Sequence, residues 1–456
     1  MQALATKVSE SREPCTRHAP PREPDRGPLR RLAATLAGPA VRNGIFSLVD
    51  QAVVSGASFA TSVIIGRLCS KEELGVFYLA LTVVYLARGI QEHAVSAPYV
   101  IYCHSRRDEG LALYSGSSLM HHLGLVSVAL VVLLGLLGAI SLGIGPAGLA
   151  PAIWVLLGAL PFLLLREFVR RLVIAHLQMT AAIAIDAGVA VLQLSSLLAL
   201  AYFHRLTVTT AYGTMGAACA VACCGWFLLK RRPMRFAWSR VVNDWRHNWG
   251  FARWAVASHL VGCLSPYLMP WIMTAARGKA AAGVLAACIS LVGVASMFMT
   301  GMATYLIPKA ALAFAHGGVR ELRRVLRTVA AVFAGVLGSF ALFVFASGDF
   351  LLVLVYGGKY AGYGATIGVL AVSVTVLSMG MTAGVGLWAI DRPKANLAAD
   401  VCTLAVTLTV IVCLVQPLGV LGAALADLSG NVAGATVRYA TLRRLLKTVR
   451  QTAEIG

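Results

Sequence analysis

Long apolar segments recur along the chain, and short clusters of charged and turn-forming residues separate them. A helix needs about 20 largely apolar residues to cross the hydrocarbon core of a bilayer. The pattern therefore predicts an all-α membrane protein of about twelve transmembrane helices. The predicted spans are residues 43–66, 75–101, 117–144, 149–173, 180–203, 209–229, 249–275, 280–307, 326–347, 362–387, 395–415 and 418–440.

Basic residues fall in alternate loops between these spans. If the N-terminus is cytoplasmic, 32 of the 39 Lys and Arg residues lie in inside segments, 6 lie in outside loops, and Arg88 lies within a span. Cytoplasmic loops of membrane proteins carry an excess of Lys and Arg. The distribution therefore predicts that both termini are cytoplasmic.

The composition supports this membrane interpretation. Hydrophobic residues make up 58% of the chain and charged residues only 13%, about half the share typical of soluble domains. So few charges cannot cover a water-soluble surface, which argues against a soluble enzyme and against a nucleic-acid partner. The formal net charge of +20 then describes how the chain sits in the membrane, and it says little about what the chain binds.

The chain divides into two similar halves. A polar, basic segment at 1–40 is predicted to be a disordered cytoplasmic tail, and 443–456 is predicted to be a second tail. A basic cytoplasmic linker at 231–247 separates two predicted six-helix bundles, 41–230 and 248–442. Gly75 and Pro98 in the first bundle are echoed by Gly283 and Pro308 in the second. Two six-helix bundles of equal orientation are related by an axis along the membrane normal.

Charged residues inside the predicted spans are the candidates for function, because each costs about 2.5–3.5 kcal/mol to insert. From their distances to the span ends, they form a belt in the cytoplasmic half of the membrane. Arg88 and Glu92 share a helix face at i,i+4, and Asp50 lies at a similar depth, so we predict a cluster of these three. The alternative is that some of these acids are near-interface residues or hydrogen-bonding contacts between helices. The candidate translocation residues are Asp50, Arg88, Glu92, Asp186, His259, Asp400 and Asp427.

Three further basic residues, Arg166, Arg170 and Arg171, crowd the end of the fourth span. Guanidinium groups bind phosphate in a bidentate manner, so these side chains are candidates for a phosphate contact at the cytoplasmic surface. The other interpretation, which we favour, is ordinary topogenic charge at the end of a span.

Motifs of common enzymes are absent from the sequence. The chain lacks the phosphate-binding G-x-x-x-x-G-K-[ST] pattern, H-E-x-x-H and G-x-S-x-G. Cys219, Cys223 and Cys224 have no His or carboxylate beside them, so we expect neither a metal site nor another cofactor. We therefore predict no catalytic residues and a transporter driven by an ion gradient or by the gradient of its cargo.

Several segments resemble the polysaccharide-exporting flippases of the multidrug/oligosaccharidyl-lipid/polysaccharide exporter superfamily. They are Ser47-Leu-Val-Asp-Gln51, Ile64-Ile-Gly-Arg67, Lys71-Glu-Glu-Leu-Gly-Val-Phe77, Leu165-Arg-Glu-Phe-Val-Arg-Arg171 and Val355-Tyr-Gly-Gly-Lys-Tyr360. The resemblance extends from Arg42 to about Leu446. It implies two six-helix bundles in a V shape, similar to the MATE transporters, that alternate between inward-open and outward-open states.

The resemblance also implies a cargo, a polyprenyl-diphosphate-linked oligosaccharide moved from the cytoplasmic to the outer leaflet. Arg88 then meets the diphosphate, while Asp50 or Glu92 carries a coupling proton or sodium ion. A bacterial inner membrane, a monomeric protein, and a glycan polymerase or assembly machinery as partner are expected in addition. The open alternatives are a cation-coupled drug exporter of the same fold, a membrane glycan-processing enzyme, and a scaffold that transports nothing.

Overall fold

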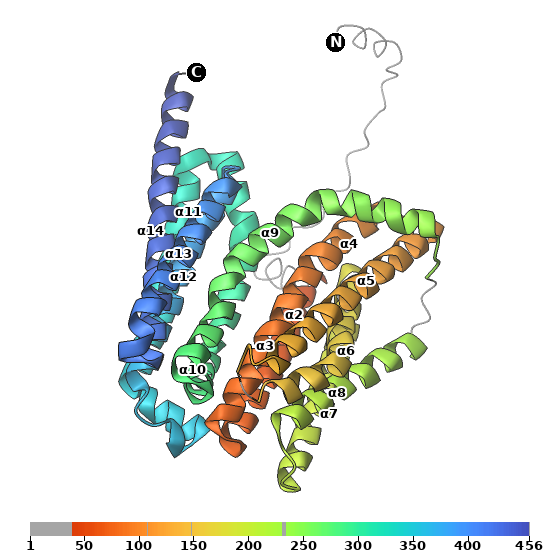
Figure 1. Ribbon diagram of the computed structural model, residues 1–456. Helices are drawn as coiled ribbons and strands as arrows, with labels where there is room; N and C mark the ends of the chain where they lie inside the picture. The colour runs from red at the N-terminus through yellow and green to blue at the C-terminus, as the bar shows by residue number, and fades with distance from the viewer. Residues whose placement is uncertain (1–38, 107, 147, 230–233, 456) are drawn as a thin grey trace, which may run out of the picture. The chain divides into compact units, whose positions relative to one another are not determined.

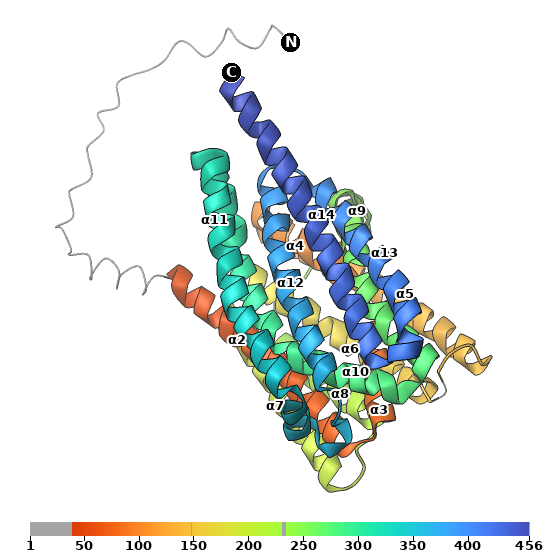
Figure 2. The same ribbon diagram turned by 90° about the vertical axis from the view of Figure 1, so that its left-hand side faces the viewer.

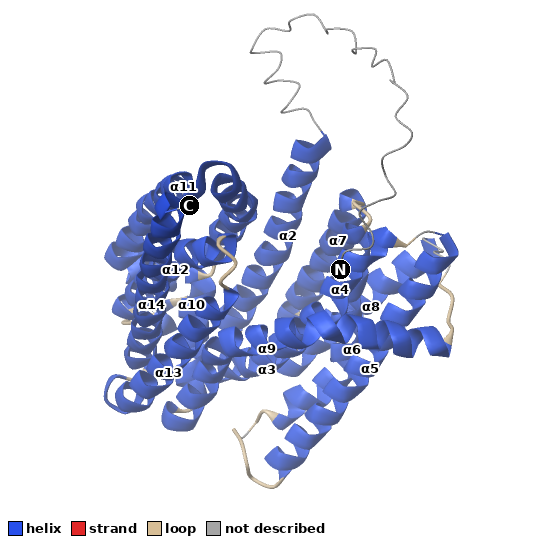
Figure 3. Cartoon of the chain, turned by 90° about the horizontal axis from the view of Figure 1, so that it is seen from above, coloured by secondary structure: helices blue, strands red, loops and turns tan. Residues whose placement is uncertain are grey.

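The computed structural model describes residues 39–106, 108–146, 148–229 and 234–455. Within these ranges every regular element is a helix, as Figure 3 shows, so the predicted all-α class is confirmed. Residues 46–456 pack as one unit. The predicted N-terminal tail, apart from the first two residues of helix α2, lies outside the described residues.

The N-terminal half of the chain comprises six membrane-crossing segments (Figure 1). The second of them is a composite of two α-helices, a π-helical turn and a 3₁₀ turn, which together cover Lys71–Ser105. The elements are α2 (Pro39–Leu68), α3 (Lys71–Gln91), η1 (Glu92–Ser96), α4 (Ala97–Tyr102), η2 (Cys103–Ser105), α5 (Asp108–Ser141), α6 (Ala150–Ala175), α7 (Met179–Tyr202) and α8 (Val208–Leu229).

The C-terminal half comprises α9 to α14 (Figures 1 and 2). Gly318, at φ 57° and ψ −152°, divides α11 into two helices, because this backbone conformation interrupts the helical hydrogen bonds. The elements are α9 (Trp238–Arg277), α10 (Lys279–Val292), α11 (Val294–Tyr356), η3 (Gly358–Tyr360), α12 (Gly364–Ala389), α13 (Pro393–Leu418) and α14 (Val420–Ile455).

The helices match the twelve predicted spans once two positions are considered. Gly293 lies between α10 and α11, and Gly318 divides α11. Eleven helices among the described residues are long and apolar enough to cross a membrane, and Lys279–Val292 is a shorter apolar helix. The short helix continues past Gly293 into the first part of α11, and together they cover the predicted span 280–307. The second part of α11, after Gly318, covers the predicted span 326–347.

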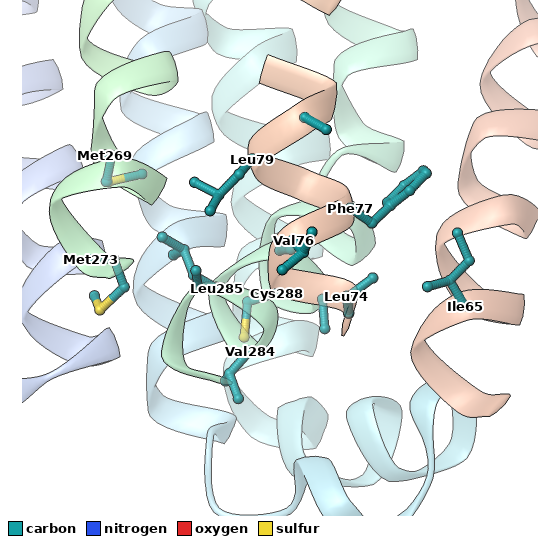
Figure 4. Close-up of a cluster of buried hydrophobic side chains, with 14 of the residues drawn as sticks. Ile65, Leu74, Val76, Phe77, Leu79, Met269, Met273, Val284, Leu285 and Cys288 are labelled. Atoms are coloured by element: carbon teal, nitrogen blue, oxygen red, sulfur yellow. The ribbon is translucent and has the colours of Figure 1, made fainter. Parts of the chain in front are cut away.

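Helix α9 connects the two halves. It begins at Trp238, within the predicted linker 231–247, of which residues 231–233 are not described. Its packing partners include α3 and α5 in the N-terminal half and α10 and α13 in the C-terminal half. A large apolar cluster joins α3, α9 and α10, and Figure 4 shows Leu79, Met269 and Leu285 among its members.

Helices α3 and α10 approach each other closely through two glycines. A Cβ at Gly75 would lie 2.1 Å from the carbonyl oxygen of Lys279, and a Cβ at Gly283 would lie 1.9 Å from that of Lys71. Small residues let membrane helices pack with their backbones in contact. The two glycines that echo each other in sequence therefore form one reciprocal contact between the halves.

Candidate functional site

Helix α6 carries four charged residues within its last three turns, and two of them, Glu167 and Arg170, are buried in the N-terminal half. Arg166 and Arg170 lie one turn apart, as do Glu167 and Arg171. The helix continues to Ala175, so these charges lie within the helix and not beyond its end. Glu167 has a side chain only 7% exposed, and that of Arg170 is 8% exposed.

Asp186 on α7 is the centre of this charged region, and its side chain is fully buried. Arg166 donates to Asp186 Oδ1 from Nε at 3.0 Å and from Nη2 at 2.5 Å. Arg170 donates to Asp186 Oδ2 from Nε at 2.6 Å and also pairs with Asp50 on α2. A buried carboxylate is stable as an anion only when such partners compensate its lost hydration.

Glu167 extends the region towards α3. Its two carboxylate oxygens bind different arginines, Arg88 Nη2 at 3.0 Å and Arg166 Nη1 at 3.1 Å. The contacts thus form one continuous chain of six residues, in the order Asp50, Arg170, Asp186, Arg166, Glu167 and Arg88. Three acids balance three arginines in this chain, which we call the charge network, so it carries no formal net charge.

Glu92 forms a separate pair beside the charge network. It lies at the start of the π-helical turn η1, and its Oε2 is 2.9 Å from Nε of Arg171. The predicted direct cluster of Asp50, Arg88 and Glu92 is therefore wrong in its contacts. Each of the three pairs with a different residue of α6, because that helix offers both charges within six residues at this depth.

The three arginines of α6 do not form a free phosphate site. Arg166 and Arg170 direct their donors at buried carboxylates, and Arg171 pairs with Glu92. Their guanidinium groups therefore compensate acids packed inside the helix bundle. The sequence signal for this was available in the apolar run Leu172-Val-Ile-Ala175, which continues the helix beyond the charges.

The predicted acids of the C-terminal half lie apart from the charge network. Asp400 on α13 pairs with Arg438 on α14. Asp427 on α14 accepts hydrogen bonds from Ser373 Oγ at 2.6 Å and Asn431 Nδ2 at 3.3 Å. Sequence reasoning missed Arg438, Ser373 and Glu167, because their contacts join helices whose relative rotation no local pattern specifies. Asn431 follows Asp427 by four residues on α14, and this spacing could have found it.

His259 on α9 is the candidate residue of the C-terminal half that packs next to α3, against Gly89 and His93. Its ring lies 4.7 Å from that of His93, centroid to centroid. A Cβ at Gly89 would lie 1.9 Å from its Nε2, so the imidazole packs directly on the backbone next to Arg88. Its Nε2 is buried without a hydrogen-bond partner among the described residues.

Two cavities meet at Arg88. One, of about 90 Å³, lies inside the N-terminal half and is bordered by Arg88, Arg166, Glu167 and Asp186. The other is a cleft of about 540 Å³ lined by α2 and α3 from one half and by α10 and α11 from the other. Among the described residues that line this cleft, Arg88 is the one charged side chain, and it is 34% exposed.

Hydroxyl and amide groups supply the rest of the polar lining of the cleft. They can donate and accept hydrogen bonds, as sugar recognition requires. Among the described residues, no group of three or more His, Cys, Asp or Glu side chains is arranged to hold a metal ion. The polar lining residues are Gln51, Ser55, Ser58, Ser62, Tyr78, Tyr85, Ser290 and Ser296.

Solved structures with the same fold are membrane transporters and a flippase. An inward-facing multidrug resistance MATE family transporter of the MOP superfamily aligns with a TM-score of 0.73 at 16% identity, over 88% of this chain and 96% of that one. The lipid II flippase MurJ, in an inward closed conformation, aligns with a TM-score of 0.71 at 11% identity, over 88% and 87%.

A MOP superfamily transporter from Pyrococcus furiosus aligns with a TM-score of 0.64 at 16% identity, over 91% of this chain and 98% of that one. In that transporter, the reverse polarity of the binding pocket suggests a different function. The chain thus shares its fold with these transporters and this flippase, and its helices are those of a multi-pass membrane protein. The three solved structures are named as transporters or as a flippase.

The family model of polysaccharide biosynthesis proteins matches residues 40–311, more than half of the chain. The chain belongs to this family. A search of the curated proteins found no match. The resemblance inferred from the sequence motifs is thereby confirmed at the level of the family.

Proposed function

We propose that the protein is a flippase for a polyprenyl-diphosphate-linked oligosaccharide, which it moves from the cytoplasmic to the outer leaflet of a bacterial inner membrane by alternating access. The observation that carries the proposal is Arg88, the one charge among the described residues that line the cleft between the halves. Membership of the polysaccharide biosynthesis family and the fold shared with the lipid II flippase support it.

Arg88 suits a diphosphate because its guanidinium presents several donors in a plane and stays charged. Glu167 holds it from behind at 3.0 Å, while about a third of the side chain faces open space. The hydroxyl-rich lining around it, including Ser55, Ser58 and Ser290, suits the sugar part of the cargo.

Coupling to an ion is the second part of the proposal. Asp50 ends the charge network, and its Oδ1 is buried without a hydrogen-bond partner among the described residues. That oxygen can take a proton or help to bind sodium. Because Arg88 and Asp50 are the two ends of one chain of contacts, a diphosphate at Arg88 weakens the contact to Glu167 and redistributes the pairing towards Asp50.

Cation-coupled drug export is the alternative function, and the alignment with the multidrug MATE transporter favours it. A site for cationic drugs needs acidic groups towards the cargo. The described lining of the cleft contains no carboxylate, since Asp50 faces Arg170 and Glu167 faces Arg88 and Arg166. A cleft whose one described charge is positive therefore favours an anionic glycan lipid over a cationic drug as cargo.

Substitution of Arg88 tests this proposal in proteoliposomes that contain a fluorescent polyprenyl-diphosphate oligosaccharide. We expect Arg88→Ala to slow translocation at least tenfold, since a charge-assisted phosphate contact contributes about 1.5–3 kcal/mol. Arg88→Lys, which keeps the charge, should retain an intermediate rate. The matched control is Arg205→Ala, in the exposed connection between α7 and α8, which should transport normally.

The outcome that contradicts the proposal is an Arg88→Ala protein that elutes and unfolds like the wild type and still translocates the glycan lipid within twofold of its rate. Thermal unfolding and size-exclusion profiles of all three variants distinguish this result from misfolding.

A further inference from the structure

A groove in the C-terminal half carries basic residues that the proposed transport cycle does not use. It has a volume of about 460 Å³ and lies between the second part of α11 and α14, over Ala383 of α12. Figure 2 shows α12 between these two helices. We call it the basic groove, and its lining residues are Arg323, Leu326, Arg327, Ala330, Ala383, Tyr439, Leu442, Arg443, Leu446 and Lys447.

The cations of the basic groove stand in two facing rows. Arg323 and Arg327 are four residues apart on α11, and Arg443 and Lys447 are four residues apart on α14. No described residue forms a hydrogen bond or ion pair with any of these four side chains, and no acid is among the lining residues. Like charges one helical turn apart repel each other, so the arrangement favours an anion between the rows.

The floor of the basic groove is apolar and rigid. Leu326, Leu442 and Leu446 are buried there. Tyr439 fixes α14 against α12, because its hydroxyl hydrogen-bonds to Thr382 at 2.8 Å and to the carbonyl of Met379 at 3.0 Å. A preformed apolar floor between two rows of cations fits a molecule with an anionic head and a hydrocarbon chain.

The position of the groove along the helices matches the headgroup layer of a membrane. The predicted span in the second part of α11 begins at residue 326, and the predicted span in α14 ends at residue 440. Arg323 and Arg327 flank the first boundary, and Arg443 and Lys447 follow the second by three and seven residues. Lipid phosphates lie at this depth, and clustered Lys and Arg at a membrane boundary attract anionic lipids.

We propose that the basic groove is a binding site for an anionic phospholipid of the leaflet that it faces. The phosphate lies between the two rows of cations, and the chains lie along the leucine floor. The site shares no residue with the cleft at Arg88, so it goes beyond the proposed transport function and does not depend on it.

Native mass spectrometry of the full-length protein, released from mixed micelles, tests the proposal. The probes are phosphatidylglycerol, phosphatidylcholine and inorganic pyrophosphate. We expect phosphatidylglycerol to be retained at low occupancy by the wild type. Arg323→Gln/Arg327→Gln/Arg443→Gln/Lys447→Gln should bind it at least tenfold more weakly, because each cation near an anionic headgroup contributes about a fivefold change.

A charge-matched control separates a built site from general positive charge. Arg320→Gln/Arg324→Gln/Lys394→Gln/Arg444→Gln removes four exposed basic residues that do not line the groove, and it should bind phosphatidylglycerol within twofold of the wild type. The pair Arg323→Gln/Arg327→Gln leaves α14 unchanged. It serves as the second variant if the fourfold substitution impairs folding.

Three results would overturn the proposal. Equal losses in the groove variant and the control variant indicate attraction by net charge alone. Equal retention of phosphatidylcholine indicates a nonspecific apolar surface. Retention of pyrophosphate as strong as that of phosphatidylglycerol indicates a site for a free phosphate ion rather than for a lipid.

Discussion

At the scale of single residues, the charge network explains how six charged groups of α2, α3, α6 and α7 persist inside a membrane. Each acid of the network has an arginine as partner, and the two inner acids, Asp186 and Glu167, have two each. Removing one partner of a buried ion pair costs more than the pair itself contributes, because the other charge is left uncompensated. The network is therefore sensitive to each member, and the groups at its ends are the ones free to change partners.

Asp50→Asn tests the coupling role of one end of the charge network. The variant keeps the side-chain shape, and Arg170 keeps its bond to Asp186, so the fold should persist. We expect wild-type translocation to accelerate under an imposed proton or sodium gradient and the Asp50→Asn rate to be independent of it. The measurement is the rate of glycan-lipid translocation in proteoliposomes with and without each gradient.

Asp400→Asn is the matched control for this experiment, because Asp400 also pairs with an arginine but lies in the C-terminal half. It should keep the response to the gradient. A gradient response that survives in Asp50→Asn and disappears in Asp400→Asn would assign the coupling to the other half of the molecule.

The sequence could predict which residues are charged within the spans but not which of them meet. Asp50, Arg88, Glu92 and Asp186 follow from hydropathy alone, since each interrupts an apolar segment. The sequence did not predict that all four contact α6. The charges of α6 lie near the end of an apolar segment, and from sequence alone they are therefore interpreted as charges that set the orientation of the span. Pairing depends on the rotation of each helix about its axis, which tertiary packing determines.

At the scale of helices, most boundaries follow from the apolar pattern, and the exceptions have a local cause. The break between α10 and α11 at Gly293 and the turn at Gly318 divide the chain differently from a count of apolar residues. The composite second crossing contains the π-helical turn η1, which begins at Glu92. Such turns add one residue to the helical ring and have no hydropathy signal.

The contact between α3 and α10 gives a prediction at this scale. Gly75→Ala should lower the free energy of unfolding by about 1–3 kcal/mol, because the new methyl group would overlap the carbonyl of Lys279 and push the helices apart. Chemical or thermal unfolding of the purified protein in detergent measures the change.

Gly262→Ala is the matched control, since Gly262 lies inside α9 and a Cβ there would meet nothing within 4 Å. Alanine is a better helix former than glycine, so this variant should be as stable as the wild type or slightly more stable. Equal destabilisation by the two substitutions would show that the close contact of α3 and α10 contributes nothing particular.

At the scale of the whole molecule, the two halves contribute unequally to the proposed site. The charge network belongs to the N-terminal half, whereas Asp400 and Asp427 of the C-terminal half form separate contacts within that half. The cleft between the halves receives one cation, Arg88, from the N-terminal half and hydroxyl groups from both. A single arginine at the boundary of two halves can hold an anionic cargo while the halves move about it.

The identity of the cargo is the central claim, and a direct comparison of two cargoes in one preparation tests it. Wild-type protein is reconstituted with a fluorescent polyprenyl-diphosphate oligosaccharide or with ethidium, a cationic drug probe, and translocation is compared with that of protein-free liposomes. We predict that the glycan lipid crosses the membrane well above the background and is recovered chemically unchanged, while ethidium moves at the background rate. Transport of ethidium without the glycan lipid, or covalent conversion of the glycan lipid, would contradict the account.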